Sequence, residues 1–222
     1  NEVQAGQFLY QLKLPVPVIT RALMNLKAEL TTLRSDLEQW AASSVWTQPR
    51  SGPRSQLSPQ VKQDISRALI CAWRRQTPSV TIEGHLGYEL DLNAWPVDSL
   101  PVLTANFDHI SVLHLSNSSS GHFPAGFLNR LPNLRILSLK SSQLVELPVA
   151  IASMAQLRVL NLQGNRIALN DETVATLSGL THLRSLNLTG NTLGRRIDVR
   201  RMGELKHLLL RHTGVADWPL GV

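Results

Sequence analysis

One pattern of leucines recurs along the chain from residue 87 onward, and it restricts the fold more than any other feature. Its complete form is Leu-x-x-Leu-x-Leu-x-x-Asn-x-Leu, with Ile counted as equivalent to Leu. Complete copies begin at Leu157 and Leu183, and degenerate copies precede and follow them. The six copies begin at residues 87, 110, 134, 157, 183 and 205, which gives spacings of 23, 24, 23, 26 and 22 residues. Such a regular period predicts a stack of similar structural units.

The alternation of leucines within each copy predicts a short strand with one buried side. Strands from successive copies then pair in parallel and form the concave sheet of a solenoid. The Asn near the end of the pattern turns the chain, and its side chain satisfies backbone groups that the turn buries. Only Asn165 and Asn191 keep this residue, whereas three other copies carry Ser or Thr. We therefore predict an α/β solenoid of about six leucine-rich repeats over residues 81–222.

A second set of apolar residues lies in the segments that return the chain from one strand to the next. Four pairs occupy the same repeat position: Leu100-Pro101, Phe123-Pro124, Leu147-Pro148 and Trp218-Pro219. Three residues after three of these prolines come Phe127, Ile151 and Val222. We expect these side chains to fill the convex half of each coil, where burial is worth roughly 1.5–3 kcal/mol for each. Because the last copy stops inside this segment, we expect the natural protein to continue beyond residue 222 with another repeat or a cap.

Residues 1–80 are predicted to form an N-terminal helical cap. Apolar residues three and four apart predict a long helix, with one stripe made of Leu23, Leu26, Leu30, Leu33, Leu37 and Trp40. A core-facing stripe is favoured over a dimeric coiled coil at this length. After a Pro/Ser-rich loop at 48–55, Ser58 offers an N-cap and Pro59 a first helical residue for a second helix. Two such helices would cover the exposed apolar end of the first repeat.

Charge and cysteine content argue against several classes of function. The net charge is +6, with ten Lys/Arg against five Asp/Glu in residues 1–80 and twelve against eleven in residues 81–222. This surplus could favour an acidic partner, but it falls short of a nucleic-acid footprint and lacks interleaved aromatic residues. Cys71 is the only cysteine, so neither an intramolecular disulfide nor a four-cysteine zinc site is possible. No run of eighteen apolar residues predicts a membrane span, and the first residues do not form a signal peptide.

The order of these features resembles the helical cap and repeat region of bacterial novel ubiquitin-ligase (NEL) effectors. The resemblance rests on Trp40 and Trp46, the Pro/Ser-rich loop, the helix from Val61 to Cys71 with its Arg67 and Ala68, and Leu-Pro pairs in the repeats. Family repeats are often shorter, near twenty residues, so the resemblance is to a divergent branch with longer repeats. It implies that the repeats recognise a host protein substrate and can restrain a separate C-terminal ligase domain. The family's Cys-x-Asp nucleophile motif is absent here, since the single cysteine reads Cys71-Ala72-Trp73.

No catalytic, cofactor-binding or metal-binding motif is predicted in the chain. Cys71 with Arg74 and Arg75 nearby could form a reactive thiolate, but a half-buried cysteine of a cap helix is the simpler interpretation. The seven histidines show no metal-ligand spacing, and no nucleophile elbow or phosphate-binding loop is present. The chain is therefore not expected to be an enzyme by itself.

The register predicts which side chains face the concave side and could contact a partner. Strand residues between the buried leucines include Val112, His114, Ile136, Ser138, Lys140, Val159, Asn161, Gln163, Asn187, His207 and Arg211. Val112, Ile136 and Val159 should stack in one apolar column, which suits a protein partner. Beside it, a basic edge is made of Arg135, Arg158, Arg184 and Lys206. This edge could either steer an acidic partner or form a solvated charge row that keeps the solenoid soluble.

The sequence leaves two functions open. The first is substrate recognition and regulation within a secreted bacterial ubiquitin-ligase effector acting in the host cytoplasm. The second is a free-standing repeat scaffold or adaptor with no attached enzyme. In both cases the expected partner is a protein, and the chain's own ligase domain is a further candidate in the first case. Neither nucleic acid nor a membrane is expected as a partner.

Overall fold

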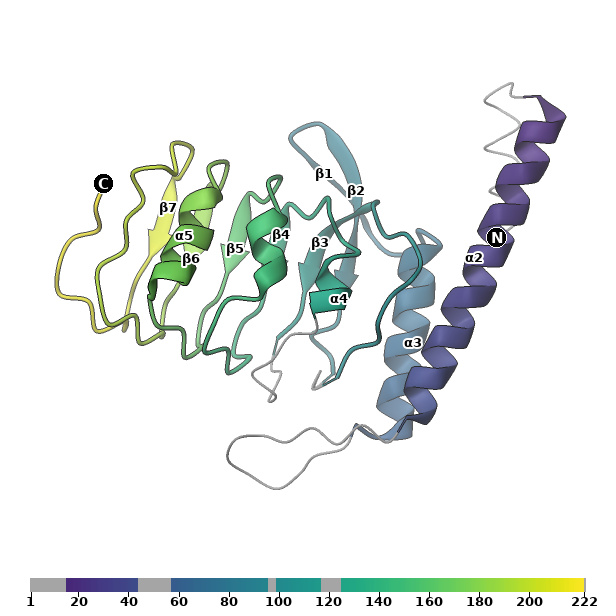
Figure 1. Ribbon diagram of the computed structural model, residues 1–222, viewed down its shortest axis with the longest axis horizontal. Coiled ribbons are helices and arrows are strands. Elements are labelled where there is room, and N and C mark those ends of the chain that lie inside the picture. Colours follow the sequence, from purple (N-terminus) through teal and green to yellow (C-terminus); the bar gives the residue numbers. More distant parts are fainter. Residues whose placement is uncertain (1–14, 44–56, 96–98, 117–124, 222) are drawn as a thin grey trace.

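The computed structural model describes residues 15–43, 57–95, 99–116 and 125–221, and it consists of two helices followed by a stack of coils with one curved sheet (Figure 1). The helices are α2 (Val16–Ala42) and α3 (Pro59–Trp73). The strands are β1 (Ser79–Ile82), β2 (His85–Asp91), β3 (Ile110–His114), β4 (Ile136–Ser138), β5 (Val159–Asn161), β6 (Ser185–Asn187) and β7 (His207–Leu209). Trp46, the loop at 48–55, Phe123-Pro124 and Val222 lie outside the described residues.

The seven strands form one sheet in sequence order, and strands β2 to β7 are all parallel. One leucine of each strand lies in register with its neighbours and faces the interior; the column is Leu113, Leu137, Leu160, Leu186 and Leu208. The first four of these leucines are fully buried. The predicted parallel solenoid sheet is thus confirmed.

Short helical segments carry the chain back along the other side of the coils. They are α4 (Ala125–Leu128), the 3-10 helix η1 (Val149–Ser153) and α5 (Asp171–Gly179), and they lie side by side (Figure 1). Phe127 and Ile151 are fully buried beneath them, as predicted. The same expectation is wrong for Trp218, which is 83% exposed because no later coil within the described residues packs against it.

The two asparagines of the repeat pattern satisfy buried backbone groups, as predicted. The Asn165 side-chain oxygen accepts hydrogen bonds from the backbone amides of Ser142 (2.9 Å) and Leu144 (3.1 Å). Its amide nitrogen donates to the carbonyls of Leu139 and Leu162, both at 2.8 Å. Each of these bonds except the last joins two successive coils. Asn191 repeats the arrangement one coil later, with three backbone partners.

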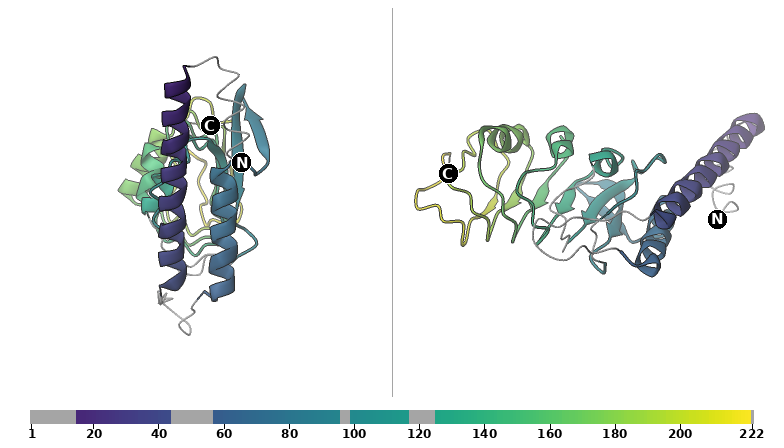
Figure 2. Two further views of the ribbon diagram at one scale, coloured as in Figure 1. Left: turned by 90° about the vertical axis from the view of Figure 1, so that its right-hand side faces the viewer. Right: turned by 60° about the horizontal axis from the view of Figure 1, so that its bottom comes forward.

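Helices α2 and α3 lie side by side at one end of the sheet, and α3 contacts β2 (Figure 2). Ser58 caps α3, since its hydroxyl accepts a hydrogen bond from the Val61 amide, as predicted. Leu33 and Leu37 belong to the same continuous core as the repeat leucines. The stripe of α2 was predicted to face the core along its whole length, and this is wrong for its first half: Leu26 is 38% exposed. The reason is length, because α2 has 27 residues and α3 only 15.

A buried lysine ties the two helices together. Lys62 of α3 is 2% exposed, and its ammonium group donates to the Trp40 carbonyl (3.2 Å) and to the Ser43 carbonyl at the end of α2. The same nitrogen lies 5.6 Å from the centre of the Trp40 ring. Burial lowers the pKa of Lys62. A cation near the last carbonyls of a helix is favourable, so Lys62 adds to the contact that the Ser43 hydroxyl makes with the Trp40 carbonyl (2.6 Å) at the end of α2.

The helices and the first repeat meet at His109. Its Nε2 lies 2.8 Å from the Ala72 carbonyl of α3, and because a carbonyl only accepts, this nitrogen must donate. The ring stacks on Phe107 and meets Tyr88 edge-on. Burial is the main cause that lowers the pKa of His109, and the positive charge of Arg75 adds to it.

We predict that this junction makes folding stability depend on pH. Because the folded pKa of His109 is below its unfolded value of about 6.5, the neutral form stabilises the fold above that pH. This stability is lost as the pH falls through the folded pKa. Urea midpoints measured at several pH values between 7.5 and 5 should therefore fall with pH. The His109→Gln variant keeps a donor for Ala72 and should show a shallower fall; an equal slope in both proteins would contradict this.

Candidate protein interface

The sheet presents two columns of side chains on its concave side. The first runs through Glu89, Val112, Ile136, Val159, Ser185 and His207, which pair across neighbouring strands. The second runs through Asp91, His114, Ser138, Asn161, Asn187 and Leu209. The predicted apolar column of Val112, Ile136 and Val159 is therefore assembled by the register of three adjacent strands.

The predicted contact residues differ in how much surface they offer. Val112 and Ser138 are only 4% and 6% exposed, so neighbouring side chains already cover them. Ile136, Val159, His114, Asn161 and Asn187 are half-buried. Lys140, Gln163, His207 and Arg211 are exposed. The accessible apolar centre of the face is thus the pair Ile136 and Val159, with polar side chains around it.

A β-hairpin that was not predicted from the sequence lies at one edge of the sheet. Strands β1 and β2 pair antiparallel through the two-residue turn Glu83–Gly84, and the predicted boundary between residues 80 and 81 falls inside β1. Both turn residues have positive φ (53° and 79°), as type I′ turns require. A Cβ on Gly87 would lie 1.8 Å from the Ser111 hydroxyl oxygen, so only glycine allows β2 to approach β3 this closely.

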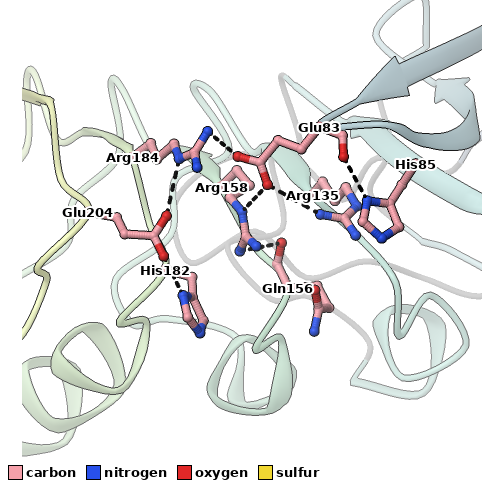
Figure 3. A network of polar contacts seen from close by, with 8 residues as sticks. All are labelled: Glu83, His85, Arg135, Gln156, Arg158, His182, Arg184 and Glu204. Carbon is pink, nitrogen blue, oxygen red and sulfur yellow. Dashed lines mark hydrogen bonds and ion pairs between the residues drawn. The ribbon is translucent and has the colours of Figure 1, made fainter.

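Glu83 at the tip of this hairpin lies against three of the four basic-edge residues (Figure 3). The Arg158 Nε donates to the Glu83 Oε2 at 2.9 Å, and the Arg135 Nη1 lies 3.8 Å from the same oxygen. Arg184 forms an ion pair with the other carboxylate oxygen. The hydrogen bond from Arg158, together with the three positive charges, lowers the pKa of Glu83. Three of the four residues of the basic edge therefore already contact an acidic side chain of the same protein.

The polar network continues toward the last repeat. The Arg184 Nε lies 3.2 Å from the Glu204 Oε2, and the His182 Nδ1 lies 2.6 Å from the Glu204 Oε1 (Figure 3). Hydrogen bonds from His182 and Arg184 lower the pKa of Glu204. Lys206, the fourth residue of the basic edge, is exposed.

Comparison with known proteins decides what the repeated coils are. Residues 108–167, which run from before β3 to beyond β5, match the family model described as leucine rich repeat. This part of the chain carries leucine-rich repeats. Among curated proteins, none matches the chain closely enough to be a relative.

Three solved structures are similar to parts of the chain. An internalin of Listeria monocytogenes is 20% identical over 46% of this chain and 28% of its own, with a TM-score of 0.38. A leucine-rich-repeat protein of Leptospira interrogans is 24% identical over 51% and 34%, with a TM-score of 0.40. The Arabidopsis receptor kinase HAESA, solved with a peptide hormone and a co-receptor, is 22% identical over 57% and 20%, with a TM-score of 0.41. The chain spans between a fifth and about a third of the length of these proteins.

No group of three or more His, Cys, Asp or Glu in the described ranges is arranged to hold a metal ion. Neither α2 nor any other described helix is long and apolar enough to cross a membrane. Cys71 of α3 is exposed, whereas the sequence led us to expect a half-buried side chain.

We predict that Cys71 has no essential role. Because the side chain is exposed, Cys71→Ala should change the free energy of unfolding by no more than about 0.5 kcal/mol. The chain should also form no ubiquitin thioester, since the Cys-x-Asp motif is absent. Denaturant unfolding and incubation with a ubiquitin-charged conjugating enzyme check both statements. A thiol-reducible ubiquitin adduct that disappears in Cys71→Ala would contradict the second.

Proposed function

We propose that this domain is a protein-interaction module whose partner binds the concave side of the sheet, with Ile136 and Val159 at the centre. One observation carries the proposal: these two half-buried apolar side chains lie in register on adjacent parallel strands, with Asn161 and Ser138 beside them. A protein interface needs an apolar centre that loses its water and a polar rim. Side chains held by sheet backbone also bind with little loss of conformational entropy.

The exposed charges at the margin of this face should act chiefly on the rate of association. Arg184 is 40% exposed even while it contacts Glu83, and Lys206 and Arg211 are exposed. Charges at a rim steer an acidic partner over distances that salt screens. We therefore assign a steering role in binding to these exposed charges, beside the apolar centre formed by Ile136 and Val159.

Within this general function, the substrate-recognition and regulatory region of a secreted bacterial ubiquitin ligase is the form that we favour. Its support is the order of α2, α3 and repeats with Leu-Pro pairs, which resembles the NEL effectors. On this proposal the protein acts in the cytoplasm of a host cell, and the partner is a host protein or the chain's own ligase domain. A downstream helical domain with a Cys-x-Asp motif in the full gene would support it. A full gene without such a domain would favour a free-standing scaffold.

Paired substitutions test the binding face. The double variant Ile136→Asp, Val159→Asp should lose its partner at any salt concentration, because two carboxylates cannot be buried there without compensation. Val149→Asp on η1 is the matched control, since that valine is 73% exposed on the opposite side of the coils. Affinity purification from a host-cell extract with quantitative mass spectrometry compares the three proteins, and circular dichroism confirms that each is folded. Proteins that the concave variant retains and the Val149→Asp control loses would overturn the proposal.

A further inference from the structure

Three arginines from successive coils converge on one carboxylate, and this arrangement leaves their charge and hydrogen-bonding capacity incompletely matched. Glu83 supplies two oxygens to Arg135, Arg158 and Arg184. Within the part of the chain that the structure describes, Arg184 alone has a second acidic partner, Glu204. A guanidinium fork normally pairs with two oxygens of one acid. One carboxylate cannot offer that geometry to three forks at once.

Arg135 shows the mismatch most clearly. Its side chain is 8% exposed, and its buried Nη1 has no hydrogen-bond partner within the described residues. The nearest acidic oxygen, at 3.8 Å, is beyond hydrogen-bond distance. A buried donor without a partner is costly, and in native proteins it points to a ligand or ordered water that completes the site.

The repeats hold the arginines in fixed positions, whereas the hairpin that carries Glu83 is attached on one side only. The Arg158 amide donates to the Arg135 carbonyl at 2.8 Å, and the Arg184 amide donates to the Arg158 carbonyl at 2.7 Å. Neighbouring strands of a sheet lie about 4.8 Å apart, so the three side chains leave the sheet at regular steps. By contrast, β1 is the edge strand of the sheet, and among the described residues it pairs only with β2.

We propose that Arg135, Arg158 and Arg184 form an oxyanion-binding site for a phosphate or carboxylate group of the partner, and that Glu83 occupies this site as an intramolecular competitor. An incoming group that places an oxygen within hydrogen-bond distance of the Arg135 Nη1, which Glu83 does not reach, displaces the hairpin tip. Glu83 must therefore leave the three arginines before a group of the partner can bind at this edge of the concave face. This inference deepens the proposed function, but its test needs no protein partner, so the two can fail separately.

The test is calorimetric titration of the purified chain with two probes, inorganic phosphate and a tetraglutamate peptide, at low ionic strength. Glu83→Gln keeps the shape of the side chain and removes its charge. We expect this variant to bind at least one probe about tenfold more tightly than the parent, because the competing charge is gone. Adding Arg158→Gln to Glu83→Gln should remove the gain. The probe that gains more affinity tells whether a phosphoryl or a carboxylate group is the preferred ligand.

A matched control separates this site from any unpaired arginine. Asp198 pairs with Arg200, whose side chain is 67% exposed, so Asp198→Asn releases a single guanidinium at the surface. Asp198→Asn should bind neither probe more tightly than the parent. Equal affinity in Glu83→Gln and the parent, or an equal gain in Asp198→Asn, would overturn the proposed site.

Hydrogen exchange tests the competitor role in the parent protein. Near saturation with the preferred probe, amides of residues 80–88 should exchange faster, since the hairpin tip has lost its anchor. Amides of β5 should be unchanged or slower. A hairpin whose exchange does not respond while the probe is bound would show that Glu83 is not displaced, and this would overturn the competitor role.

Discussion

Leu160→Ala is expected to destabilise the domain by about 2–5 kcal/mol, as large-to-small changes at rigid core positions do. Leu160 is fully buried at the centre of the leucine column, between Leu137 and Leu186 on the adjacent strands. Backbone hydrogen bonds on both sides fix the spacing of these strands. The coils therefore cannot close over the cavity that the substitution leaves.

Urea unfolding followed by circular dichroism measures this effect. Leu209→Ala is the control, because Leu209 is 43% exposed on the concave side of β7 and its truncation should cost less than about 0.5 kcal/mol. If both variants had the same midpoint as the parent, the side of the strand that faces the core would be assigned incorrectly.

Asn165→Ala is expected to have an effect of similar size, although it removes little apolar surface. Four hydrogen bonds to backbone groups of two coils are lost with the amide. At about 0.5–1.5 kcal/mol for each bond, the expected loss is about 2–6 kcal/mol. Within the described turn, no other side chain can replace the Asn165 amide. Small movements therefore do not restore the lost hydrogen bonds.

Two further asparagines calibrate this prediction. Asn191→Ala removes three hydrogen bonds of the same kind and should destabilise slightly less. Asn133→Ala removes one exposed hydrogen bond, from its side-chain nitrogen to the Asp108 carbonyl, and should be nearly neutral. The unfolding midpoint should therefore be highest for Asn133→Ala, lower for Asn191→Ala and lowest for Asn165→Ala. An Asn165→Ala variant as stable as Asn133→Ala would contradict this prediction.

The repeats could be predicted from the sequence because their physics is local and periodic. A buried leucine every second residue defines each strand, and the same spacing recurs often enough to fix the order and direction of all parallel strands. The capping of α3 by Ser58 followed from equally local chemistry. How much of α2 packs against the core could not be predicted from the sequence, because it depends on the length of α3 and not on the apolar stripe of α2.

The sequence signal for the hairpin is weaker than the signal for the repeats. No sequence signal indicates which residues the hairpin contacts. Glu83-Gly84 between Val80–Ile82 and Leu86–Tyr88 is a possible two-residue turn between two short strand-like runs, so the hairpin itself could have been recognised. The contact between Glu83 and Arg158 joins residues 75 positions apart. No spacing rule relates a turn residue to a row of arginines in later repeats. The contact between Glu83 and the arginines of the basic edge could therefore be recognised only from the structure.

The most direct test of the binding face is photo-crosslinking from single positions. A photoreactive phenylalanine analogue replaces Asn161, which is half-buried on the concave side, or Ala152, which is exposed on η1. Each protein is irradiated in the same host-cell extract, and the crosslinked products are identified by mass spectrometry. We expect a discrete protein adduct from position 161 and none from position 152. A discrete adduct from position 152 alone would contradict the concave binding face.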